Sequence, residues 1–315
     1  MLLARRDGLR RRARHAGPLF DLRAAHAAYP WLLTWDDHDV ANDYAGLVPN
    51  DDEPLAEFAL RRTAAYRAYY EHMPLRAVHR PRADGGMLLQ SRLDFGTLAR
   101  INLVDDRQYR SPHPCSDRGE MVRDCAQRWA VDQTIFGSAQ EQWLHAGMET
   151  STARWNVLAQ QTLIAPFEYR ASDGGYDVWT DGWDGYAGAR SRLLNRIAER
   201  GTRNVVALGG DMHAFYVTDL KTDFTDTAAA PVATEFVGTS VTSSDVDYAA
   251  VSRDLPHNPH VRYFESRWRG YLFCEITPET WRTDLRIVDD VQNAASAGRN
   301  LVSFHVEDGR PGAQI

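Results

Sequence analysis

Residues 31–43 read WLLTWDDHDVAND, an apolar run that changes abruptly into a cluster of acids. Residues 31–35 are typical of a short buried strand, and the next eight residues hold four Asp, one His and one Asn. Adjacent carboxylates repel one another, so crowding them is unfavourable unless a cation neutralises the cluster. We therefore predict that a strand delivers a metal site to the loop behind it. Carboxylate oxygens, an amide oxygen and an imidazole nitrogen are suitable ligands for Ca, Mg, Mn, Fe or Zn. The alternative is an acidic surface turn, and Asp39 and Asp43 are expected to take a capping or supporting role.

A second cluster, Gly209-Gly210-Asp211-Met212-His213, follows the apolar residues 204–208. The glycines allow the backbone to approach a ligand closely, and Asp211 and His213 can present two donors to one site. An ordinary Gly-Asp turn with a structural histidine is the alternative. Because open sheets collect ligands at strand ends, two such clusters in one chain favour a shared metal site.

Two further polar stretches follow predicted strands. Residues 155–161 read WNVLAQQ, so Gln160 or Gln161 could offer an oxygen to a cation or simply cap a turn. Residues 105–110 read DDRQYR, and Arg107 could form paired hydrogen bonds with a phosphate or pair with the neighbouring acids.

The pattern along the chain predicts one domain with mixed layers. Helical periodicity predicts helices over 55–70, 139–149 and 186–200, the last ended by Gly201. Apolar runs predict strands over 98–104, 155–158, 204–208, 233–237, 271–276, 281–288 and 301–306. This mixture favours α/β or α+β layers, with sheet dominating the second half. Residues 1–17 are expected to be a loose basic N-terminus and residues 18–315 the domain.

Composition narrows the class of function. The 315 residues carry a net charge of −7, with 43% hydrophobic and 25% charged residues, which is typical of a globular protein. The sequence contains no apolar run long enough for a bilayer span. It offers no basic excess for nucleic acid or an anionic membrane, so small-molecule chemistry is favoured. The arginine-rich start lacks the apolar stretch of an export signal.

The three cysteines differ in their surroundings. Cys274 lies in an apolar run and is expected in the core. Cys115 and Cys125 stand ten residues apart in a polar stretch, where a disulfide and two free thiols are about equally expected. A disulfide would indicate an oxidising compartment.

Residues 177–186 read DVWTDGWDGY and only loosely match a calcium loop, since the EF-hand spacing and terminal Glu are missing. We favour an aromatic surface loop that shapes the mouth of a substrate site.

Taken together, these stretches resemble the PhoD-like alkaline phosphatase/phosphodiesterase family within the calcineurin-like metallophosphoesterases. The matching residues are WDDHDVANDYAG (35–46), VDDRQYRS (104–111), WNVLAQQTLIAPF (155–167), GGDMHAF (209–215), EFVGTSVTSS (235–244) and NPHVRYFESRWRGY (258–271). The resemblance implies an α/β fold: a metallophosphoesterase-type β-sandwich flanked by helices. It also implies hydrolysis of phosphate mono- or diesters by a metal-activated hydroxide, with iron and calcium as cofactors. The disulfide between Cys115 and Cys125 becomes the favoured alternative.

The resemblance assigns roles residue by residue. It implies that Asp37 binds metal and that His38 stabilises the transition state or protonates the leaving oxygen. Arg107 would contact substrate. The further implied metal ligands are Asn42, Gln160, Asp211 and His213.

The resemblance also implies upstream parts: a prefix domain, a strand ending in cysteine and a Gly-Asp-x-x-Tyr motif. The sequence shows none of these, so we expect a fold incomplete on its N-terminal side. A non-catalytic relic or binding module is therefore the alternative function. The family is exported, which implies an extracytoplasmic origin, whereas the chain as given would stay where it was made. A small phosphoester is the expected partner, and the sequence makes no prediction of oligomeric state.

Overall fold

A computed structural model describes residues 19–315 except 245 and 294. The predicted loose N-terminus at 1–17 lies outside these residues. Among the described residues, no helix is long and apolar enough to cross a membrane.

Within the described ranges, the strands form three sheets. The largest has the order β1 (Ser91–Phe95), β2 (Ala99–Leu103), β4 (Trp155–Ala159), β7 (Val205–Gly209), β9 (Ala233–Val237), β8 (Phe215–Leu220) and β10 (Val261–Glu265). The second is β11 (Arg269–Ile276), β12 (Thr280–Val288), β13 (Gly298–Glu307) and β14 (Arg310–Gln314), all antiparallel. The third and smallest is β3 (Met121–Arg123), β6 (Tyr176–Trp179) and β5 (Tyr169–Arg170).

Helices accompany these sheets. They are α2 (Leu19–Ala28), α3 (Leu55–His72), α4 (Ser138–Glu149), α5 (Ala187–Arg200) and α6 (Tyr248–Asp254), with short 3-10 turns at Ala77–His79, Ala126–Trp129 and Leu255–His257. The three predicted helices are confirmed as α3, α4 and α5. Gly201 ends α5 in the left-handed region, with φ of 60°.

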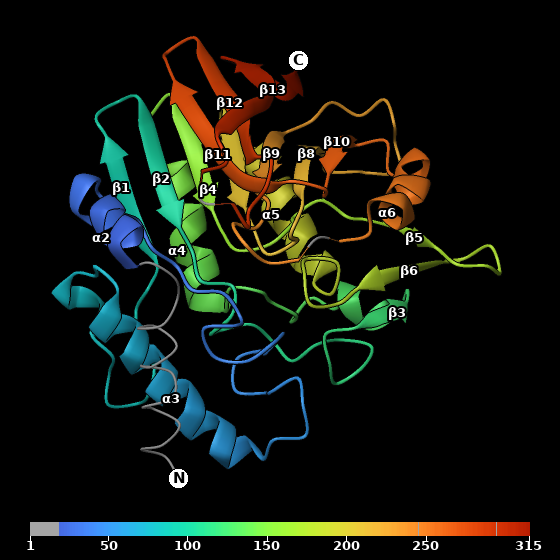
Figure 1. Ribbon diagram of the computed structural model, residues 1–315. Helices are drawn as coiled ribbons and strands as arrows, with labels where there is room; N and C mark the ends of the chain where they lie inside the picture. Colours follow the sequence, from blue (N-terminus) through green and yellow to red (C-terminus); the bar gives the residue numbers. More distant parts are fainter. Residues whose placement is uncertain (1–18, 245, 294) are drawn as a thin grey trace.

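The main sheet has a hydrophobic core on each face. One core joins it to the four-stranded sheet and includes Val206, Phe236, Trp281 and Leu285. The other lies against α4 and α5 and includes Leu144 and Leu193. Figure 1 shows these layers, with β11 to β13 stacked over the main sheet. The predicted α/β sandwich flanked by helices is confirmed.

A third core cluster fixes the segment that carries the acidic loop. Trp35 is 1% exposed and stacks on Tyr66 of α3, with ring centroids 3.9 Å apart. Its indole nitrogen also donates to Asp105 Oδ1 at 3.0 Å. Trp35 therefore ties the acidic loop both to α3 and to the residues that follow β2.

The strand predicted at 31–35 is wrong. Among the described residues these five form no strand and pair with none, and Trp31 and Leu32 are 39% and 42% exposed. The hydroxyl of Thr34 donates to the carbonyl oxygen of Val104, the residue after β2, at 3.2 Å. The apolar side chains lie beside Leu93 and Leu103 in a shallow pocket, so they pack on the sheet edge instead of joining its ladder.

Candidate active site

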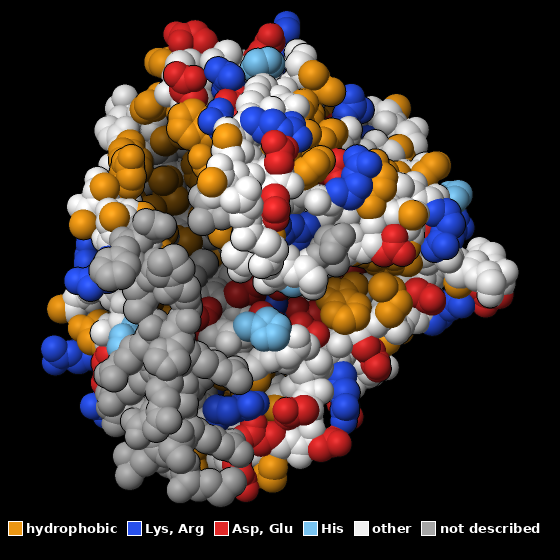
Figure 2. Space-filling model, viewed as in Figure 1, with side chains coloured by type: hydrophobic (Ala, Val, Ile, Leu, Met, Phe, Trp, Pro, Cys, Tyr) orange, Lys and Arg blue, Asp and Glu red, His pale blue; other side chains and the backbone are white. Residues whose placement is uncertain are grey.

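The sheet topology brings the predicted polar stretches together. Strands β2, β4, β7 and β9 run parallel, so their carboxyl ends share one edge. The acidic loop and the Gly209–His213 turn both line one cavity of about 690 Å³ at this edge. Figure 2 shows acidic side chains gathered in a hollow near the centre of this face, beside a histidine and a hydrophobic group.

Three carboxylates converge in the cavity wall. Asp36, Asp37 and Asp211 each present an oxygen, and these atoms all lie within 4.8 Å of one another. Asp37 is only 4% exposed, and its carboxylate accepts the backbone N–H groups of His38 at 2.7 Å and Asp43 at 2.9 Å. Those two bonds hold the Asp37 carboxylate in place before any ligand arrives.

The turn after β7 has an uncommon backbone. Asp211 and His213 adopt left-handed φ values of 64° and 51°, which non-glycine residues rarely take. Gly209 is needed for close packing, because a Cβ there would stand 2.3 Å from the carbonyl oxygen of Thr162. The turn thus aims an acid and a histidine at the cavity under local strain.

Arg107 neutralises the carboxylates from behind. It is completely buried, and its Nε donates to Asp36 at 3.0 Å while Nη1 donates to Asp181 at 2.8 Å. Its Nη2 lies 3.5 Å from Asp211 Oδ1 and makes no hydrogen bond. Arg107 does not line the cavity. The geometry therefore favours pairing with neighbouring acids over direct contact with a phosphate.

The electrostatics reflect this crowding. Burial, reinforced by the charge of Asp36, raises the pKa of Asp211 well above its usual range. Burial and Asp181 raise the pKa of Asp43 to about 7. Burial alone would also raise the pKa of Asp181, but the guanidinium groups of Arg107 and Arg110 hold it well below the usual value. The cavity side is thus rich in carboxylates and short of positive charge.

These donors fit a metal cation. Three carboxylate oxygens lie close together, one arginine cannot balance every acid nearby, and carboxylate, amide and imidazole groups are ordinary ligands of hard and intermediate metals. Asn42 and His213 line the same cavity as the carboxylates. The Nδ1 atom of His213 lies 2.9 Å from Ser244 O, which leaves its Nε2 for a ligand.

Comparison with known proteins places this geometry in a family. The sequence model of the PhoD-like phosphatases matches residues 7–285. The chain belongs to the PhoD-like phosphatase family. Alkaline phosphatase D of Bacillus subtilis (strain 168) is 41% identical over 299 residues, which are 93% of this chain and 50% of that protein.

A solved structure of the family agrees. A structure described as "Structure of PhoD" aligns with a TM-score of 0.88 and 39% identity, covering 93% of this chain and 56% of that one. The PhoD-like chain thus spans about half the length of the relatives it matches. The resemblance inferred from the sequence motifs is confirmed.

The structure brings most of the predicted site residues of this PhoD-like chain to the cavity, but not all. Asp37, His38, Asn42, Asp211 and His213 line it. Gln160 does not: its side-chain oxygen accepts from the Thr162 backbone N–H at 3.0 Å and from Trp183 Nε1 at 3.2 Å. Its role as a metal ligand remains an untested prediction.

The structure adds two acids to the site that the sequence analysis does not assign to it. Asp36 joins the convergent trio, and it stands next to Asp37 in the same motif, so the sequence signal was present. Asp181 accepts from Arg107, Arg110 and His113, which lie in another segment. Only the tertiary fold brings Asp181 to Arg107.

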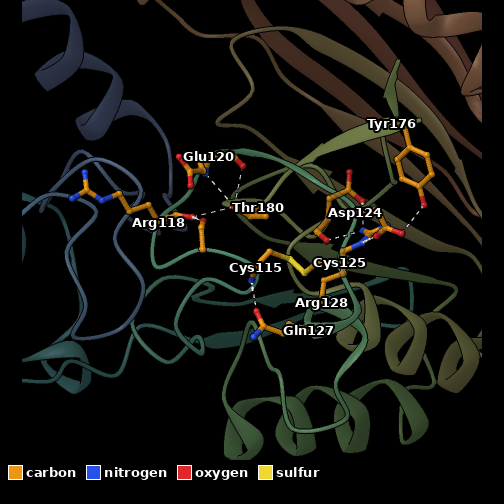
Figure 3. The surroundings of a disulfide bond; sticks show 11 residues. Cys115, Arg118, Glu120, Asp124, Cys125, Gln127, Arg128, Tyr176 and Thr180 are labelled. Carbon is orange, nitrogen blue, oxygen red and sulfur yellow. Dashed lines mark hydrogen bonds and ion pairs between the residues drawn. A yellow bond between two sulfur atoms is a disulfide. The ribbon is translucent and has the colours of Figure 1, made fainter. Parts of the chain in front are cut away.

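The disulfide is confirmed between Cys115 and Cys125. It closes the loop that contains β3, as Figure 3 shows. Cys274, by contrast, is a free and half-buried thiol packed against the core between the sheets.

Proposed function

We propose that the chain hydrolyses phosphate mono- or diesters with bound metal cations, as an alkaline phosphatase or phosphodiesterase of the PhoD type. The observation that carries the proposal is the convergence of Asp36, Asp37 and Asp211 within 4.8 Å in a cavity wall of a PhoD-like chain. When bound, such cations supply Lewis acidity and activate water for attack on phosphorus. Iron and calcium are the cations we propose.

Each residue has a distinct part in this proposal. Asp36, Asp37 and Asp211 would hold the cations, with Asn42 and His213 as further ligands. Arg107 would keep the carboxylates oriented, since it bonds Asp36 while held by Asp181.

His38 is placed to handle a proton. Its side chain is 75% exposed, and its Nε2 lies 3.8 Å from Asp37 Oδ2 at the cavity wall. An imidazole at this position is within reach of a substrate in the cavity and can donate a proton to a leaving oxygen.

The test is hydrolysis of bis(4-nitrophenyl) phosphate and 4-nitrophenyl phosphate by the purified chain with iron and calcium. We expect activity that a chelator removes and that His38→Ala lowers by about 100-fold or more. His305→Ala is the matched control, because His305 is an exposed histidine of β13 outside the cavity. Equal activity of the two variants would contradict the role of His38.

The alternative function is a non-catalytic binding module. A folded chain that binds cations but hydrolyses neither ester would support it. We further propose an extracytoplasmic working compartment, because the Cys115–Cys125 disulfide is typical of oxidising surroundings.

A further inference from the structure

The lining of the cavity is chemically mixed. Besides the acids, its lining includes apolar and aromatic side chains: Met121, Tyr169, Trp179, Met212, Tyr216 and Val246. A volume of about 690 Å³ is in the range of pockets that hold whole organic ligands, so a bare phosphate group would leave most of it unfilled. The cavity therefore has room for a group attached to the phosphorus.

Met121 and Trp179 form one surface because of strand pairing. They are direct partners in the antiparallel ladder of β3 and β6, so both side chains point to the same face of the small sheet. Met121 is 43% exposed, and Trp179 is partly exposed at the cavity. Thioether and indole offer a flat, polarisable surface for an apolar group.

This surface is rigidly held beside the acids. The N–H and hydroxyl groups of Thr180 donate to Glu120 O at 3.1 and 3.0 Å, at one end of β3. At the other end, Tyr176 donates to Asp124 at 3.1 Å, and the disulfide closes the loop (Figure 3). Asp181 then follows Thr180 and pairs with Arg107 behind the carboxylates. Trp179 of the apolar surface is therefore two residues along the chain from Asp181, which belongs to the charge network of the site.

The charges argue against a polyanionic ester group. Among the described residues that line the cavity, none is Lys or Arg, whereas Asp36, Asp37, Asp43 and Asp211 are acidic. Away from the proposed metal ligands, a nucleoside polyphosphate or another multiply charged group would find no basic side chain in this lining to pair with.

We propose that Trp179 and Met121 form a subsite for an uncharged aromatic ester group, which makes the preferred substrates phosphodiesters carrying such a group. The inference rests on the proposed function, because the phosphorus must sit at the carboxylates for the ester group to reach Trp179.

The test compares two diesters with the same leaving group. The metal-loaded chain is assayed with 4-nitrophenyl phenyl phosphate and with 4-nitrophenyl methyl phosphate. We expect Trp179→Ala to lower kcat/KM for the phenyl ester about tenfold relative to the methyl ester. Trp129→Ala is the matched control, since Trp129 is 51% exposed outside the cavity. Met121→Ala, which shortens a half-exposed side chain, is a second test and should also lower kcat/KM for the phenyl ester relative to the methyl ester.

A binding readout separates failure of the subsite from failure of the enzyme. Calorimetry on the same metal-loaded protein compares phenylphosphonate with methylphosphonate. Tighter binding of phenylphosphonate that Trp179→Ala removes supports the subsite, even if neither ester is hydrolysed and the proposed function fails. Equal binding of the two phosphonates, or an unchanged kcat/KM of Trp179→Ala for both esters, overturns it.

Discussion

Removing the Cys115–Cys125 disulfide tests how much of the site's architecture depends on it. The bond joins residues ten apart, and the loop-entropy relation gives about 3 kcal/mol of stabilisation for a loop of that length. For a chain of 315 residues this corresponds to a fall in Tm of about 4 °C. We expect Cys115→Ser with Cys125→Ser to show this loss in thermal melts followed by circular dichroism.

A thermal melt of the wild-type protein with a reducing agent is an independent test. Its Tm should fall by the same amount relative to the melt without the reducing agent. Cys274→Ser is the matched control, because burial raises the pKa of that thiol to about 11 and keeps it unreactive at neutral pH. A Tm change below about 1 °C in the double variant would refute the reasoning. It would mean that the hydrogen bonds of Thr180 to Glu120 and of Tyr176 to Asp124 already hold the loop.

Three further predictions address the buried charges and the backbone. Arg107→Leu should lower the free energy of unfolding by about 3–5 kcal/mol in urea titrations, because it leaves the buried carboxylate of Asp181 without its main partner; a loss under about 1 kcal/mol would contradict this. Burial lowers the pKa of His260 to about 4, so its neutral form stabilises the fold above about pH 6.5 and this contribution is lost as the pH falls towards 4. The stability lost between pH 7 and 4 should therefore be about 3 kcal/mol smaller in His260→Gln than in the wild type, as measured by urea titration. Gly201→Ala should reduce stability by about 1 kcal/mol in thermal melts, because φ is 60° and nothing lies within 4 Å to compensate; an unchanged Tm would rule out backbone strain there.

The parts of the fold predicted from sequence are those with strong local patterns. Strand β7 is continuously apolar and is followed by glycines, and α5 repeats its buried residues at helical spacing before Gly201. Asp211 follows β7, and the strand-end argument placed it correctly at the edge of the sheet. Asp37 lies at the same edge, but the segment before it is not a strand, so the argument from a strand end was correct for Asp211 alone.

Other features depend on tertiary context. Residues 31–35 have the composition of a buried strand, yet Trp31 and Leu32 pack on an edge, since apolar composition does not specify a pairing partner. Strand β1 reads SRLDF, with too few apolar residues to predict it. The hydrogen bonds of Gln160 with Thr162 and Trp183 form in turns that no local sequence pattern predicts.

The left-handed turn at Asp211 and His213 has a consequence for how this sequence can change. Glycine at either position would relieve backbone strain and add stability, but it would delete a side chain that faces the cavity. Selection for heat resistance alone should therefore favour glycine at these two positions, whereas selection for catalytic turnover should keep Asp211 and His213. Mutant libraries sorted separately by folding and by hydrolysis should diverge most sharply at these two positions.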